Sequence, residues 1–429
     1  MSARQIDFDF KFVTFALTGN FYLAALFLAF VEVVRFAEID LTGYFRFLAL
    51  GITVILLLAH SGRYLQVFFQ ERLLCCLICS FLLLLIVQIL LVEDQFLHLQ
   101  GSVQVCFYLI CVLSSLYSSY YYSTRVRDVL VNLAVVLFIS VIIFYPYLIY
   151  QTGMLPYERI MTRGWRLHLL LGAGNEDAHF MATLSPFILA KLYRSKLITG
   201  IFLAFLFLAL IYNGTLAALL MTIIISTLYY FMSSRKKIPM LLFMIMILVL
   251  AGGSILEVFS VLFERQKVLI NYYDRFLGGE YLGENLSGRL ALVWLPALRY
   301  TIENCFWTGF GSNGWPMVAN TIAVLHIEGI QQAASPHNFF VWSFSNWGIV
   351  GLVLIICLFY RCIRYSWHSA ITSTTFNERR ISVAIFCSWV GFVGWCMIAN
   401  SHGPYGWTVL VLLILLSISN RYHLLKGTR

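Results

Sequence analysis

Residues 264–294 read ERQKVLINYYDRFLGGEYLGENLSGRLALVW, and residues 329–348 read GIQQAASPHNFFVWSFSNWG. These stretches stand near the two ends of residues 261–338, by far the longest segment too polar to lie in a lipid bilayer. It holds five of the 29 Lys and Arg residues, and an apolar run follows it directly. The sequence therefore predicts that any chemistry lies in this segment, and that the rest of the chain is the scaffold presenting it.

The composition indicates a membrane protein. Of 429 residues, 61% are hydrophobic and 11% are charged, whereas about a quarter of residues are charged in soluble domains. A bilayer core requires about 20 apolar residues of a crossing helix. Twelve apolar runs are candidates: 12–34, 44–60, 73–92, 102–122, 128–150, 167–190, 197–212, 215–233, 238–258, 338–360, 381–399 and 405–420. The alternating strands of a membrane β-barrel are absent from the sequence.

The predicted fold is an all-α polytopic membrane protein with about twelve transmembrane helices and one large periplasmic loop. Residues 1–260 would hold helices 1–9, residues 261–337 would form the loop with short interfacial helices, and residues 338–429 would hold helices 10–12. Within the loop, residues 290–304 have apolar positions at helical spacing, which favours an interfacial amphipathic helix. Pro296 predicts a kink or break in it.

Charge predicts the orientation. If the N-terminus lies inside, 19 of the 29 Lys and Arg residues fall in inside segments, as the positive-inside rule demands. Eight of the other ten fall in just two outer segments, residues 151–178 and 261–338. Both termini are then cytoplasmic. The net charge of +9 comes from inside loops and does not indicate nucleic-acid binding.

His337 stands at the start of an apolar run and has three interpretations. It is a helix-cap or interfacial histidine without chemistry, a metal ligand, or a general base. A metal site would need His326 and Glu328 as partners, and their spacing is irregular. A general base fits because histidine takes up a proton near neutral pH.

The outward arginines also have two interpretations. Arg265 and Arg289 are solvated or snorkelling charges, or they bind phosphate, which the guanidinium fork suits. Their excess on the face where positive charge is disfavoured indicates an anionic ligand, most simply a lipid-linked phosphate or diphosphate. In the smaller outer segment, three arginines precede the stretch GAGNEDAHF: Arg159, Arg163 and Arg166. The polar residues of that stretch line a cavity or form a plain loop. They are Asn175, Glu176, Asp177 and His179.

Three motifs together resemble the O-antigen ligase and polymerase superfamily of bacterial inner membranes. They are SGRLALVW (287–294), WTGFGSNGW (307–315) and HNFFVWSFSNWGIVGL (337–352). The resemblance implies an inverting glycosyl transfer on the periplasmic side from an undecaprenyl-diphosphate-linked O-antigen donor, with no metal and no cofactor. It implies that His337 deprotonates the acceptor hydroxyl and that Arg265 and Arg289 bind the leaving diphosphate.

The chain departs from the family at one place. Many members carry a small polar residue followed by arginine at the outer end of a mid-chain helix, where this chain has Asn213-Gly214-Thr215. Arg163 or Arg166 is the hypothetical replacement for that phosphate contact.

The single long outer loop favours an O-antigen ligase acting on lipid A–core. An O-antigen polymerase and a protein O-oligosaccharyltransferase remain alternatives. A flippase of lipid-linked glycans is a third alternative, from a different class. It is disfavoured because ionisable residues crowd one face of the membrane instead of following its whole depth.

Overall fold

The computed structural model describes residues 61–91, 95–152, 174–193, 195–213, 216–234, 293–326, 336–398 and 404–427. Every regular element within these ranges is a helix. The predicted runs at 12–34, 44–60 and 238–258 lie outside them.

Twelve helices are described. They are α3 Ser61–Gln70, α4 Arg72–Leu91, α5 Gln95–Tyr121, α6 Ser123–Thr152, α8 Gly174–Leu192, α9 Lys196–Asn213, α10 Leu216–Ser233, α14 Leu295–Cys305, α15 Trp315–His326, α16 Phe339–Thr372, α17 Phe376–Ile398 and α18 Pro404–Gly427. The described part of each of the other nine predicted apolar runs lies in a helix or at its end. Within the described part of the chain, four segments are long and apolar enough to cross a membrane: α4, α16, α17 and residues 409–426 of α18. The chain is thus a multi-pass membrane protein.

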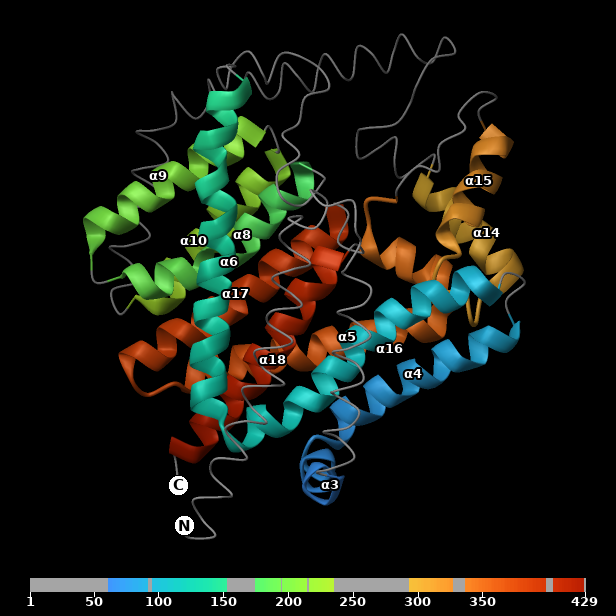
Figure 1. Ribbon diagram of the computed structural model, residues 1–429, viewed down its shortest axis with the longest axis horizontal. Helices are drawn as coiled ribbons and strands as arrows, with labels where there is room; N and C mark the ends of the chain where they lie inside the picture. The colour runs from blue at the N-terminus through green and yellow to red at the C-terminus, as the bar shows by residue number, and fades with distance from the viewer. Residues whose placement is uncertain are drawn as a thin grey trace.

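Helix α17 is central to the packing. It contacts α16 on one side and α8 and α10 on the other, and α18 packs against α5, α6 and α16 (Figure 1). Three tryptophans, Trp347, Trp389 and Trp395, are completely buried. The apolar surface of α16 and α17 is therefore largely covered by other helices of the same chain.

Helices α14 and α15 pack together beside the N-terminal part of α16 (Figure 1). Pro296 lies in the first turn of α14, where its missing N–H costs no helical bond. Trp294, directly before α14, also has helical backbone angles, φ −73° and ψ −50°, so the backbone is helical on both sides of Pro296 and the predicted break is not seen there. Ala297 and Thr301 are buried, whereas Leu295 and Ile302 are each 54% exposed. Helix α14 therefore has one buried and one exposed face.

A buried carboxylate joins three helices at the C-terminal end of α16. Glu71, just before α4, accepts hydrogen bonds from Tyr365 Oη at 2.6 Å, Arg421 Nη1 at 2.6 Å and Tyr422 Oη at 2.8 Å. Arg361 lies 4.0 Å away on α16. Because Glu71 is only 1% exposed, its charge requires these partners. This cluster stabilises the bundle at the end of α16 opposite His337.

Candidate active site

His337 lies immediately before α16 and is partly exposed. Its φ angle is +47°, in the left-handed region that residues other than glycine seldom adopt. Such a conformation persists when the residues on both sides are held by other contacts. Both neighbours of His337 have contacts of this kind.

Asn338 holds one side. Its Oδ1 accepts hydrogen bonds from the backbone N–H groups of Phe340 at 2.9 Å and Val341 at 3.1 Å, so it caps α16. Its Nδ2 donates to the carbonyl of Met397 in α17 at 3.2 Å. Asn338 thus fixes the start of α16 to the end of α17.

Pro336 holds the other side. Its carbonyl accepts a hydrogen bond from the indole Nε1 of Trp294 at 2.6 Å. Trp294 is the last residue of the SGRLALVW motif, so this bond brings the end of that motif beside the residue that precedes His337. The motif's arginine, Arg289, lies outside the described residues.

The glycine-rich turn between α14 and α15 enters a break in α16. Gly348 has φ +61° and ψ −166°, which interrupts the helix and frees backbone groups on both sides. The freed carbonyls of Ser345 and Asn346 accept from the N–H groups of Phe310 at 2.9 Å and Gly311 at 2.8 Å. The freed N–H of Ile349 donates to the Phe306 carbonyl at 2.8 Å. The turn therefore replaces the hydrogen bonds that α16 loses.

Only glycine fits where the turn meets the break. A Cβ on Gly309 would lie 2.5 Å from the backbone nitrogen of Gly348, and a Cβ on Gly348 would lie 2.4 Å from the carbonyl carbon of Trp307. Both glycines also have positive φ. This explains physically why the glycines of WTGFGSNGW and of the Trp-Gly-Ile-Val-Gly stretch occur together.

Helix α5 supports the same turn through a buried histidine. His98 Nδ1 accepts from the backbone N–H of Ser312 at 2.8 Å, and Nε2 lies 3.0 Å from the Leu85 carbonyl. Because an N–H can only donate and a carbonyl can only accept, His98 is neutral with its proton on Nε2. Ser102 Oγ and the indole Nε1 of Trp347 both reach Ser312 Oγ, at 2.9 and 3.2 Å.

Helix α4 contributes a buried glutamine. Gln88 Nε2 donates to the carbonyl of Asn346 at 2.9 Å and to the carbonyl of Thr308. Asn346 Oδ1 in turn accepts from the backbone N–H of Trp315 at 2.8 Å. The Gln88 side chain thus joins α4 to both the glycine turn and the break in α16.

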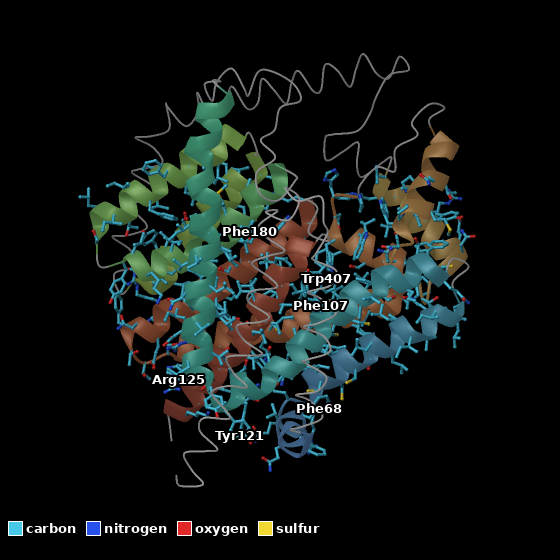
Figure 2. All side chains as sticks on the ribbon, viewed as in Figure 1. Phe68, Phe107, Tyr121, Arg125, Phe180 and Trp407 are labelled. Atoms are coloured by element: carbon cyan, nitrogen blue, oxygen red, sulfur yellow. The ribbon has the colours of Figure 1, made fainter. Side chains whose placement is uncertain are left out.

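Aromatic rings pack around the first turns of α16. The ring centroid of Trp407, which is labelled in Figure 2, lies 6.0 Å from that of Phe339 and 6.1 Å from that of Trp347. The Trp407 ring also stacks on Tyr108, with 5.8 Å between the ring centroids. Trp342 packs edge-on to Trp347 at 4.8 Å. Large buried rings with few rotamers keep the first turns of α16 in one position.

The predicted site residues divide into two groups. Of the predicted base and diphosphate-binding residues, His337 falls within the described ranges, and Arg163, Arg166, Arg265 and Arg289 all lie outside them.

In the GAGNEDAHF stretch, His179 is buried in α8. Its ring stacks on Trp395 of α17 at 6.2 Å. His179 therefore packs in the core between α8 and α17.

The sequence interpretation did not single out Trp294, His98 or Gln88. Trp294 carried a signal, because it ends one of the three motifs. His98 and Gln88 carried none that distinguishes them from polar residues near a helix end.

Comparison with protein families places an O-antigen ligase domain at residues 201–356. The matched range contains Trp294, the glycine turn, His337 and the break at Gly348. No curated protein matches the chain. The match covers residues 201–356 of the 429-residue chain, and it supports a role in O-antigen and lipopolysaccharide assembly.

Proposed function

We propose that this chain, with its O-antigen ligase domain at residues 201–356, transfers O-antigen glycan from undecaprenyl diphosphate to a sugar hydroxyl of lipid A–core. The chain would act in the bacterial inner membrane with the site facing the periplasm and both termini in the cytoplasm. Residues 261–337 would be the periplasmic segment that carries the reactive groups.

One observation carries the proposal: the geometry around His337. The residue is partly exposed at the start of α16, and the chain is held on both of its sides: the Pro336 carbonyl accepts a hydrogen bond from Trp294, and Asn338 Oδ1 accepts one from the Phe340 N–H. A general base must be both accessible to substrate and held in position.

In the proposed reaction, a ring nitrogen of His337 takes the proton of the acceptor hydroxyl. The acceptor oxygen then forms a bond to the anomeric carbon as the bond from that carbon to the diphosphate oxygen breaks. The electron pair leaves with undecaprenyl diphosphate, and attack from the opposite face inverts the anomeric configuration. His337 afterwards releases the proton to water.

The arginines would stabilise the leaving group. Negative charge develops on the diphosphate as its bond to the sugar breaks, and guanidinium groups are well suited to bind it. Arg265 and Arg289 are assigned this role, with Arg163 and Arg166 from the smaller outer segment as further contacts.

The test is transfer in reconstituted vesicles that contain the lipid-linked glycan donor. One reaction contains lipid A–core and the other a second lipid-linked unit, each with and without EDTA. We expect EDTA-resistant transfer to lipid A–core, lost in His337→Ala and kept in His368→Ala, which changes an exposed histidine near the other end of α16. Extension of the second lipid-linked unit alone would identify a polymerase, and full activity of His337→Ala would remove the proposed base.

A further inference from the structure

Trp294 forms a contact across a long stretch of sequence. Its indole N–H donates to the carbonyl of Pro336, 42 residues later in the chain, at 2.6 Å. The ring is partly buried and packs against the hydrophobic core. A tryptophan indole has one polar atom, a donor, and in Trp294 that donor is used on the residue before His337.

The acceptor of this bond matters because of peptide planarity. The Pro336 carbonyl and the His337 backbone nitrogen belong to one planar unit, so holding the carbonyl also sets the direction of the His337 N–H. On the far side, the carbonyl of Asn338 accepts from the N–H of Trp342 at 3.0 Å, within the first turn of α16. The left-handed backbone of His337 is therefore held between two restrained neighbours.

We propose that Trp294 is a positioning residue for His337, an inference that rests on the proposed function. Its hydrogen bond sets the direction in which the imidazole leaves the backbone. It also ties the end of the SGRLALVW motif to the residue before the histidine, and only four residues of sequence lie between Arg289 and Trp294. Trp294 thus couples the phosphate-binding stretch to the base without touching substrate itself.

The test compares Trp294→Phe with Trp367→Phe in the reconstituted transfer assay. Phenylalanine keeps an aromatic ring but has no N–H. Trp367 lies near the other end of α16 and is 45% exposed, so its replacement controls for the loss of an indole. We measure kcat per folded molecule, KM for the lipid-linked donor, and the melting temperature.

For Trp294→Phe we expect kcat to fall about 10- to 100-fold, because small misplacements of a reacting group cost this much. KM should change by less than about threefold, since phosphate binding is not removed. Trp367→Phe should keep the wild-type kcat. A wild-type kcat in Trp294→Phe, or an equal fall in the Trp367 control, would overturn the inference.

A second variant covers the case in which Trp294→Phe does not fold. Benzothienylalanine inserted at position 294 by nonsense suppression keeps the indole shape and replaces only the N–H by sulfur. The same fall in kcat is expected, and an unchanged kcat rejects the role of Trp294.

Failure of the proposed function has a different signature. If His337→Ala keeps the wild-type rate, the base assignment is wrong. If His337→Ala is inactive while both position-294 variants are fully active, only the role of Trp294 is wrong.

Discussion

Gly309 and Gly348 come so close that a Cβ on Gly309 would lie 2.5 Å from the Gly348 nitrogen. Gly309 belongs to the turn after α14, whereas Gly348 interrupts α16. At this contact, the turn from the predicted loop packs directly against the predicted transmembrane helix. The residues that present His337 depend on this contact, because it sets where α14 lies against α16.

Replacing either glycine by alanine should destabilise the protein strongly. Positive φ and the backbone clash together predict a loss of about 2–4 kcal/mol for Gly348→Ala or Gly309→Ala. The measurement is the melting temperature in detergent. Gly200→Ala is the control, because a Cβ there meets nothing within 4 Å and alanine favours the helix. Equal melting temperatures for all three variants would contradict the close approach.

His98→Leu should weaken the support of the glycine turn. The substitution leaves the buried N–H of Ser312 without its acceptor, at a cost of about 1–3 kcal/mol. We expect a lower melting temperature and a lower transfer rate, measured on the same preparation. His368→Leu, at an exposed position on α16, should alter neither. Stability unchanged by His98→Leu would show that the Ser312 N–H has another partner.

Glu71→Gln should lower stability without lowering the rate per folded molecule. The substitution leaves Arg421 without a carboxylate, but Arg421 is one-third exposed, so water reduces the cost to about 1–3 kcal/mol. Activity should persist because Glu71 contacts α16 at the end away from His337. Glu303→Gln breaks an exposed pair with Arg299 and should leave the melting temperature unchanged. A fall in kcat with Glu71→Gln would link the two ends of α16.

Arg163→Gln and Arg166→Gln test the hypothetical replacement for the family arginine missing at Gly214. If either guanidinium binds the diphosphate, kcat/KM for the donor should fall by about tenfold or more, since hydrogen bonds to charged groups are the strong ones. Arg364→Gln, an exposed arginine in the C-terminal part of α16, is the matched control. Full transfer activity in both variants would remove these residues from the site.

The sequence predicted the helices well because hydrophobic runs report burial in a membrane directly. It separated α9 from α10 at Asn213-Gly214, and the two are distinct helices. It also predicted a helix over residues 290–304, where the structure describes α14 at Leu295–Cys305. These features depend on local composition, which one sequence records.

The break at Gly348 could not be predicted in the same way. Gly348 lies inside an apolar run, and the backbone groups that it frees are satisfied by residues about 40 positions earlier. The left-handed conformation of His337 likewise depends on Trp294 and Asn338 acting together. Hydropathy and spacing contain no information on such long-range hydrogen bonds, so His98 and Gln88 were missed for the same reason.

The hydrogen bonds between the glycine turn and α16 have a practical consequence for protein engineering. Because the turn supplies partners to both sides of the break, residues 306–311 and 345–350 are joined by hydrogen bonds and do not divide into an exchangeable loop and a fixed membrane helix. A chimera that takes only the outer segment from another protein would separate the hydrogen-bond donors of the turn from their acceptors in α16. We therefore expect a chimera with an O-antigen ligase to fold when the graft boundary lies beyond Val350, and to fail to fold when it lies at Pro336.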